Sequence, residues 1–282
     1  MIKFLAQCVT LALLTLLAAC APKPPEPQEP PLPLPGYEAL EDGGFAIPAV
    51  DVRLMADGYQ RTEVVYTGAE KPGTIVVDPY ARKLYLVQDG GLATRYGIAV
   101  GREGLSFKGA GIIGRMEKWP AWTPTANMVK TRPDLYLEYA GGMSGGLDNP
   151  LGARALYLYR NGKDSNFRIH GTLDNNSIGH ATSAGCVRLY NQDVIDLFSR
   201  VKMGAKVKVR SFDESLAMEG AFMEDAYGRA VPDTPENQAI KLKDAEALAA
   251  AEAANPVLAA YHAAARAEEE AAKRQAQAAG GN

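Results

Sequence analysis

The sequence predicts a mainly β domain, a sandwich or a barrel, with one short helix near its end and a helical tail after it. Between Thr74 and Gly101, β-branched and aromatic runs such as "TIVVDP" and "KLYLVQ" alternate with turn residues at short intervals. This spacing is typical of sandwiches and barrels. Residues 194–201 carry apolar side chains at helical intervals. Residues 239–279 are mostly Ala, Glu, Lys, Gln and Arg, which are good helix formers.

The first residues have the features of a targeting signal. Lys3 precedes an apolar run at Phe4–Leu17, and "LAAC" ends at Cys20. Such a run is typical of a secretory signal peptide, here residues 1–19, and is too short for a spanning helix. The cysteine resembles a bacterial lipoprotein signal, which implies cleavage before Cys20, lipidation of Cys20 and a periplasmic, membrane-anchored protein. Ala21 favours the outer membrane; the alternative is an ordinary secretory signal with a chance cysteine.

A proline-rich linker is predicted for residues 20–36, which contain "APKPPEPQEPPLPLPG". So much proline disfavours helix and sheet and gives an extended, semi-rigid spacer. Such a spacer would hold a globular body away from a membrane. Residues 37–71 have scattered apolar positions, and we expect them to wrap the next domain as an irregular N-terminal arm.

The main domain is predicted for residues 72–211. Asp89-Gly90-Gly91 is a strong hairpin signal, and "ATRYGIAVG" is expected to form the next strand, up to Gly101. Residues 102–155 are rich in Gly and Pro, and we expect loop there until a strand at Arg154–Tyr159.

Trp119 and Trp122, the two tryptophans of the chain, lie in this loop. Packing within the loop is the favoured interpretation, because tryptophans are large and mostly buried. The alternative is an aromatic wall or lid over a groove.

The domain is expected to end with a strand, a helix and a strand. "FRIHGT" forms a strand that carries His170 near its end, and Asn191 is expected to cap the helix. Gly204 follows the helix, and "AKVKVR" is the last strand. Residues 212–282 are predicted to form a solvated, partly disordered helical tail that breaks at Pro256; the alternative is a helix that binds peptidoglycan or a partner.

The candidate chemistry lies in residues 168–191, "RIHGTLDNNSIGHATSAGCVRLYN". Cys8 leaves with the signal peptide and Cys20 carries lipid, so Cys186 is the thiol that remains in an oxidising compartment. A thiol acts as a nucleophile in its thiolate form, and a nearby imidazole such as that of His170 commonly takes its proton. Each residue alone also fits a buried structural role, but the joint pattern favours a cysteine nucleophile.

The motif "HGT…S-x-GC-V-R-L" resembles the signature of the YkuD-type L,D-transpeptidases, cysteine enzymes of bacterial peptidoglycan. The resemblance covers roughly residues 72–210 and implies a YkuD-like β-sandwich or barrel that needs no cofactor. Many members have His directly before the Gly-Cys pair, where this chain has Ala184. That position is not the general base in the family, so the departure concerns substrate contacts rather than the chemistry.

The roles that we assign begin with Cys186, whose thiolate attacks a carbonyl carbon. His170 accepts the thiol proton and later handles the amine protons. A backbone carbonyl, that of Gly171, would fix the imidazole tautomer by accepting its other N–H, in place of the carboxylate of a usual triad.

Three neighbours of the thiol receive supporting roles. Backbone N–H groups at Gly185 and Cys186 could form an oxyanion hole, and Ser183 would order the loop through its hydroxyl. Arg188 offers a planar fork that suits a peptide carboxylate.

His180 is a rival base, nearer to Cys186 in the sequence but in a polar, flexible segment. His170 is favoured because it occupies the family's motif position. A metal site made by His170, His180 and Cys186 is also conceivable, but the paired spacing of zinc sites is missing, so no metal is expected.

The resemblance implies a peptidoglycan tetrapeptide stem as the substrate, cleaved between diaminopimelate and D-Ala and held as a thioester. Another stem as amine acceptor gives a 3→3 cross-link, an outer-membrane protein gives a covalent tether, and water makes the enzyme an L,D-carboxypeptidase. A non-catalytic, peptidoglycan-binding lipoprotein is a further alternative. The formal net charge of −3 gives no indication of a nucleic-acid partner.

Overall fold

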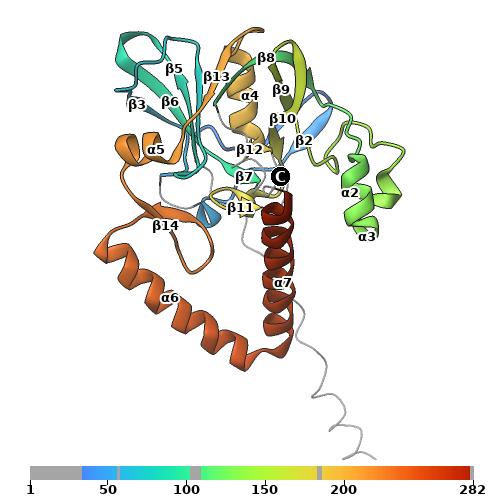
Figure 1. Ribbon diagram of the computed structural model, residues 1–282, viewed down its shortest axis with the longest axis vertical. Helices are drawn as coiled ribbons and strands as arrows, with labels where there is room; N and C mark the ends of the chain where they lie inside the picture. The colour runs from blue at the N-terminus through green and yellow to red at the C-terminus, as the bar shows by residue number, and fades with distance from the viewer. Residues whose placement is uncertain (1–33, 56–57, 102–108, 183–185, 280–282) are drawn as a thin grey trace, which may run out of the picture. The chain divides into compact units, whose positions relative to one another are not determined.

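The computed structural model describes residues 34–55, 58–101, 109–182 and 186–279 (Figure 1). The chain divides into two units, residues 1–31 and 32–282. The first unit lies outside the described residues, and so do Cys20, Ser183 and Gly185. The signal peptide and the lipidation of Cys20 therefore stay predictions.

A large mixed sheet dominates the described residues, with strand order β11-β7-β12-β10-β9-β8-β13-β4-β5-β6-β3, and β1–β2 and β14–β15 form two separate hairpins. The strands are β1 (Leu40–Asp42), β2 (Phe45–Ile47), β3 (Thr62–Val65), β4 (Ile75–Asp78), β5 (Lys83–Val87), β6 (Leu92–Gly97), β7 (Ala99–Gly101), β8 (Gly109–Lys118), β9 (Arg154–Arg160), β10 (Lys163–Thr172), β11 (Ala181–Thr182), β12 (Val187–Tyr190), β13 (Lys206–Val209), β14 (Phe222–Glu224) and β15 (Ala230–Pro232). The α-helices are α2 (Ala126–Thr131), α3 (Pro133–Tyr136), α4 (Asn191–Arg200), α5 (Phe212–Glu219), α6 (Pro235–Ala254) and α7 (Pro256–Ala279). Short 3₁₀ turns lie at Val52–Leu54, Asp89–Gly91, Leu137–Tyr139 and Asn175–Ser177.

The mainly β fold with a helix after residue 190 and a helical C-terminal part is confirmed. Most predicted strands are present, and the turn at Asp89–Gly91 joins β5 to β6 with Gly90 and Gly91 at positive φ. The segment "ATRYGIAVG" forms two strands, β6 and β7, which pair with different neighbours.

Strand β8 was missed, because its sequence "GAGIIGRMEK" was assigned to the Gly-rich loop. Gly114 is needed at the pairing with β9, since a Cβ there would lie 2.3 Å from the Tyr159 ring. The register shifts between Ile113 and Arg115 at this point, so the glycine marks a bulge inside a strand, as isolated strand glycines often do.

Helix α4 fills the concave side of the sheet. Its Val194 and Leu197 are fully buried in one apolar cluster with residues of β4, β5, β9, β10 and β12. Figure 1 shows α4 between the β5–β6 strands and the β8–β10 strands. The strands that carry this cluster therefore pack their apolar side chains against one amphipathic helix.

Residues 37–71, which the sequence predicted to wrap the domain as an irregular arm, are bound to the start of α4 by side-chain contacts. The Tyr37 hydroxyl donates to Asp193 Oδ2 at 3.0 Å, and Arg61 lies 3.3 Å from Asp193 Oδ1. The Gln192 side chain donates to the carbonyl oxygens of Glu38 and Pro48. Burial raises the pKa of the fully buried Asp193 carboxyl to about 7, although the Arg61 charge acts against this shift.

A second clamp joins the β1–β2 hairpin to the sheet. Asp42 accepts two hydrogen bonds of 2.7 Å from the Arg154 guanidinium and a third of 2.7 Å from Trp119 Nε1. The Trp119 ring also packs against Phe45 at 4.3 Å between centroids. The packing interpretation of Trp119 is confirmed. Trp122 instead lies near Tyr136 and Tyr139, at 6.2 and 6.3 Å.

The chain after β13 adds ordered structure before the predicted helices. Helix α5 and the β14–β15 hairpin come first, and α6 and α7 then meet at Pro256, where the break was expected. Helix α6 carries no buried residue, as its composition predicted. In the part of the chain that the structure describes, no helix is both long and apolar enough to cross a membrane.

A buried charge network attaches α5 to the sheet. Arg210 Nη1 lies 3.1 Å from Asp78 Oδ2 and 2.6 Å from Glu219 Oε1, and the Ser215 hydroxyl donates to Asp78 Oδ1 at 2.8 Å. The side chains of Asp78 and Arg210 are 0% and 3% exposed. A charge at such a depth needs its partner, because water cannot replace it.

We predict that Arg210→Met lowers the free energy of unfolding by about 3–5 kcal/mol, because it leaves the Asp78 carboxylate buried without its countercharge. The matched control is Arg132→Met, whose ion pair with Asp134 is 37% and 60% exposed and should contribute about 0–1 kcal/mol. Urea denaturation of both variants measures the difference, and equal losses would contradict the network's role.

Candidate active site

The candidate site is assembled by the parallel pairing of β10 with β12. In this register His170 lies opposite Arg188, and Ile169 lies opposite Val187. The Gly101 N–H donates to the Cys186 carbonyl at 3.0 Å, which continues the ladder between β7 and β12 to the thiol residue. Two segments separated by a loop of more than ten residues therefore meet side by side, with β12 between β7 and β10.

Strand periodicity decides which side chains share a face. Ile169 and Leu189 are fully buried in the cluster around α4, so they point to the concave side. Side chains alternate along a strand, and His170 and Arg188 therefore point to the opposite face. Cys186 directly precedes β12, and its charge acts on Arg188, so we expect its side chain on the same side as those of Arg188 and His170.

The His170 imidazole is held in one tautomer. Its Nδ1 lies 2.7 Å from the Gly171 carbonyl oxygen, and since a carbonyl oxygen only accepts, Nδ1 carries the proton and donates it. Nε2 then presents its lone pair. This hydrogen bond was the one expected from the sequence, and it gives the imidazole the orientation that a carboxylate gives in a usual triad.

Burial keeps this imidazole neutral. His170 is 5% exposed, and burial lowers its pKa from 6.5 to about 4. The hydrogen bond to the Gly171 carbonyl opposes this shift, and the charges of Arg188 and then Arg168 lower the pKa further. At neutral pH, His170 can therefore accept a proton at Nε2, as a general base must.

The Arg188 guanidinium supplies positive charge beside the thiol. Burial lowers its pKa, while the Asp174 carboxylate and the negative charge of Cys186 act in the opposite direction. A cation in a poorly solvated place favours a neighbouring anion, so a thiolate at Cys186 would gain from the Arg188 charge. The Cys186 side chain itself is half-buried and is not in a disulfide.

Asn191 fixes the backbone behind the imidazole, and the sequence did not reveal this role. We expected Asn191 to cap α4, but Tyr190 is the N-cap, and Asn191 Oδ1 accepts from the Ala153 N–H at 2.9 Å. A Cβ on Gly171 would lie 2.1 Å from that same oxygen, and a Cβ on Gly152 would lie 2.5 Å from it. Both glycines are thus required by close packing at the base of the site.

The sequence is similar to a known family of catalytic domains. Residues 72–209 match the family model described as YkuD, the L,D-transpeptidase catalytic domain. An Escherichia coli (strain K12) protein named probable L,D-transpeptidase ErfK/SrfK is 30% identical over 169 residues, which are 58% of this chain and 53% of that protein. A Fuscovulum blasticum protein named putative L,D-transpeptidase in ATP synthase subunits region ORF 5 is 34% identical over 137 residues, 48% of this chain and 68% of that protein.

The chain belongs to the YkuD family of L,D-transpeptidase catalytic domains. It spans about half the length of curated relatives such as the Escherichia coli protein. A solved structure from Brucella melitensis, titled a probable carnitine operon oxidoreductase, is 45% identical, with 55% of this chain and 96% of that chain covered and a TM-score of 0.40. The family assignment comes from the family model and the curated relatives.

Within this YkuD domain, the structure sets His170 opposite Arg188, whereas His180 lies against the β14–β15 hairpin. His180 forms a backbone bridge with Arg229, and a Cβ on Gly228 would lie 3.5 Å from His180 Nδ1. Burial and the Arg229 charge lower the pKa of His180. Its packing against the β14–β15 hairpin favours a structural role over that of a base.

Three predictions about the site remain: the roles of Ser183 and Gly185, and the expectation that no metal is bound. Ser183 and Gly185 lie outside the described residues, so their roles stay predictions. Among residues 34–55, 58–101, 109–182 and 186–279, no group of three or more His, Cys, Asp or Glu side chains is arranged to hold a metal ion.

We predict that Arg188→Met raises the pKa of His170 above about 4, because it removes a positive charge that disfavours the imidazolium. The measurement is a pH titration of the histidine ring resonances by NMR. The control is Arg132→Met, which changes an exposed arginine at the N-cap of α3 and should leave the pKa of His170 unchanged. An unchanged or lower value in Arg188→Met would show that the guanidinium does not act on the imidazole.

We also predict that Gly171→Ala destabilises the protein by about 1–3 kcal/mol through overpacking against Asn191. Gly141→Ala is the control, since nothing lies within 4 Å of a Cβ built there, and such open positions change stability by less than about 0.5 kcal/mol. Denaturant unfolding measures the free energy of unfolding of both variants. Equal values for Gly171→Ala and Gly141→Ala would contradict the overpacking, because they would mean that the backbone at Gly171 moves to make room for the methyl group.

Proposed function

We propose that this protein is a peptidoglycan L,D-transpeptidase in which Cys186 is the nucleophile and His170 the general base. The observation that carries the proposal is the register of β10 and β12, which sets His170 opposite Arg188, the residue two positions after Cys186. The neutral, singly oriented imidazole and the membership in the L,D-transpeptidase family support it.

Acylation begins with proton transfer from the Cys186 thiol to Nε2 of His170. The thiolate attacks the carbonyl carbon of the L-centre of diaminopimelate in a tetrapeptide stem, and the carbonyl π electrons move to oxygen. When the oxyanion collapses, the C–N bond to D-Ala breaks and the imidazolium gives its proton to the leaving amine. The stem is then a thioester on Cys186, and His170 is neutral again.

Transfer repeats these steps in the other direction. An acceptor amine loses a proton to Nε2 of His170 as its nitrogen attacks the thioester carbonyl. The C–S bond breaks, the thiolate takes the proton back, and a new amide forms. An amine from another stem gives a 3→3 cross-link and an amine from an outer-membrane protein gives a tether, whereas attack by water gives a shortened stem. No cofactor enters the balance.

Two groups near the thiol would stabilise this chemistry. Backbone N–H groups at Gly185 and Cys186 are proposed to hold the oxyanion, a contribution of about 2.7–4 kcal/mol per donor in other enzymes. Arg188 is proposed to hold a stem carboxylate in addition to favouring the thiolate, since a guanidinium can serve both through its several N–H donors.

The proposed location follows from the first 36 residues. Cleavage before Cys20 and lipidation of its thiol would anchor the protein in the periplasm, with the outer membrane favoured. The proline-rich residues 21–36 would act as the spacer between the lipid and the domain.

We predict that purified protein converts disaccharide-tetrapeptide into cross-linked dimers with release of D-Ala, and that Cys186→Ala abolishes the conversion. His170→Ala should slow it by about 10²–10⁴-fold, the usual contribution of a general base. Mass spectrometry of the products measures both and separates dimers from the tripeptide that water would give.

The control variants for this assay are His180→Ala and His262→Ala. His262 lies in α7, where it pairs with Glu252, and its change should leave turnover unaffected. A loss in His180→Ala as large as that in His170→Ala would move the base to His180. Turnover by Cys186→Ala would contradict the mechanism altogether.

A further inference from the structure

A pocket with a volume of about 210 Å³ lies on the side of the domain formed by α5 and β14, and its residues have no part in the chemistry described above. Its lining combines aromatic, aliphatic and charged residues: Tyr80, Arg82, Phe212, Ser215, Leu216, Gly220, Ala221, Phe222, Met223, Glu224 and Ala230. Sites that enclose drug-sized ligands measure about 300–1,000 Å³, so this pocket has room for a single ring or side chain.

The walls of the pocket are aromatic. Tyr80 and Phe212 meet edge to face at 5.4 Å between centroids. Phe222, at the start of β14, also lines the pocket. Phe212 is 57% exposed and Leu216 is 45% exposed. The pocket therefore offers apolar ring surface that remains open to solvent.

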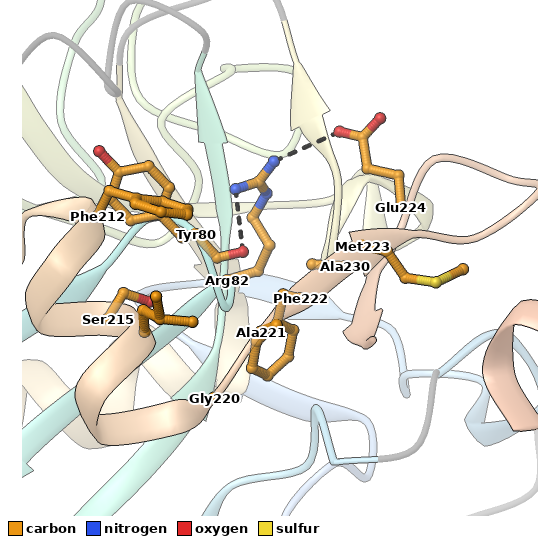
Figure 2. A pocket seen from close by; sticks show the side chains of 11 residues that line it. Tyr80, Arg82, Phe212, Ser215, Gly220, Ala221, Phe222, Met223, Glu224 and Ala230 are labelled. Carbon is orange, nitrogen blue, oxygen red and sulfur yellow. Dashed lines mark hydrogen bonds and ion pairs between the residues drawn. The ribbon is translucent and has the colours of Figure 1, made fainter. Parts of the chain in front are cut away.

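One edge of the pocket is charged and incompletely paired. Arg82 is 6% exposed, yet its Nε has no hydrogen-bond partner among the described residues. Arg82 Nη2 lies 3.6 Å from Glu224 Oε1, which is longer than a hydrogen bond, and Glu224 is 53% exposed. Figure 2 shows the guanidinium between the Tyr80–Phe212 pair and Glu224.

The guanidinium is held in place before any ligand arrives. Its Nη1 donates to the Pro79 carbonyl and lies 3.5 Å from the Tyr80 carbonyl oxygen. Burial lowers the pKa of Arg82, so this cation lacks part of the solvation that it would have in water. Nε is buried, so the donor offered to a ligand is Nη2, on the Glu224 side of the guanidinium, and an acceptor on the ligand would complete its hydrogen bonding.

The ligand must therefore offer an apolar face and, along one rim, both an acceptor and a donor. A sugar ring meets this requirement, because its C–H face packs on aromatic rings and each hydroxyl both accepts and donates. Neighbouring hydroxyls can accept from Arg82 and donate to Glu224 together. A proline ring offers an apolar face without an N–H and leaves Glu224 unpaired, and an acidic ligand would be repelled by Glu224.

The pocket is connected to the loop that precedes Cys186. Ala230, which lines the pocket, donates its N–H to the Gly179 carbonyl at 3.0 Å. The Gly179 N–H donates to Ile98, and the Ile98 N–H donates to the Arg82 carbonyl, each at 3.0 Å. Three backbone hydrogen bonds thus join both sides of the pocket to the segment between His170 and Cys186.

We propose that this pocket is a saccharide subsite that takes one N-acetylhexosamine ring of the glycan strand to which a donor stem is attached. The identity of the sugar rests on the proposed function, because stems of peptidoglycan are carried on N-acetylated amino sugars. Aromatic walls pack on the ring, Arg82 donates to a hydroxyl or acetamido oxygen, and Glu224 accepts from a hydroxyl.

The first test is binding of N-acetylated chitotetraose (the tetra-N-acetyl form, called chitotetraose below) to the purified protein, measured by calorimetry. Glu224→Gln and Phe212→Ala should each weaken binding at least about tenfold, the effect of losing roughly 1.4 kcal/mol. The matched controls are Glu246→Gln and Tyr261→Ala on the C-terminal helices, where Tyr261 is 70% exposed; both should bind like the wild type. Absence of chitotetraose binding, or equal weakening in the controls, would overturn the proposal.

The second test compares a tetrapeptide borne on disaccharide with the free tetrapeptide. The pocket variants should raise KM for the first at least about tenfold and leave kcat and the KM of the free peptide unchanged. An equal change for both substrates would indicate a structural effect and contradict the subsite. A peptide of residues 21–36 that binds the pocket where chitotetraose does not would also overturn it, in favour of a proline-rich peptide.

The two tests keep this proposal separate from the proposed function. If neither substrate is turned over but chitotetraose binds and the pocket variants lose it, the saccharide subsite stands and the transpeptidase proposal fails. If stems are turned over and chitotetraose does not bind, the transpeptidase proposal stands and the saccharide subsite fails.

Discussion

The parallel pairing of β10 with β12 is the constraint on which the rest of the structure depends. It is the one contact that turns two distant pieces of sequence, the end of "FRIHGT" and the start of "CVRLY", into neighbours with a fixed register. Because side chains alternate along both strands, the same pairing buries Ile169 and Leu189 against α4 and turns His170 and Arg188 to the other face. A slip by one residue would reverse both sets at once, so stability and chemistry select the same register.

Elements from both ends of the chain hold this pairing in place. Asn191 at the start of α4 fixes Ala153 beside Gly171, and the N-terminal arm clamps the following turn of the helix through Tyr37 and Asp193. On the opposite side, the hairpin after α5 supports the loop before Cys186, since Ala230 donates to Gly179 and the Tyr59 hydroxyl donates to the Ala230 carbonyl at 2.7 Å. Segments outside residues 72–209 therefore contribute directly to the rigidity that a nucleophile and its base need.

Much of this arrangement could be predicted from the sequence, and the exceptions have physical causes. The strands between residues 74 and 101, the later strands β9, β10 and β13, helix α4 and the break at Pro256 followed from local patterns, whereas β1, β2 and β3 lie in residues 37–71, where an irregular arm was expected. The hydrogen bond between His170 and the Gly171 carbonyl was expected from the role assigned to the imidazole. Strand β8 was missed because Gly114, a residue that usually weakens a strand, is present to admit the Tyr159 ring. The role of Asn191 was missed because an Asn before an apolar helix is a normal cap signal, and its contact with Ala153 across 38 residues leaves no local trace. The β14–β15 hairpin was missed because all of residues 212–282 was assigned to the helical tail, although residues 220–234 contain the Gly, Pro and aromatic residues typical of turns and strands.

The most direct test of the central claim, that the His170 imidazole deprotonates the Cys186 thiol for attack on a stem carbonyl, is rapid-quench intact-protein mass spectrometry with tetrapeptide stem. The account predicts a covalent adduct with the mass of the stem minus D-Ala, attached at Cys186, which forms in wild-type protein and forms about 10²–10⁴-fold more slowly in His170→Ala. An adduct that forms equally fast without the imidazole, or a stem that is processed while Cys186 stays unmodified throughout, would contradict it.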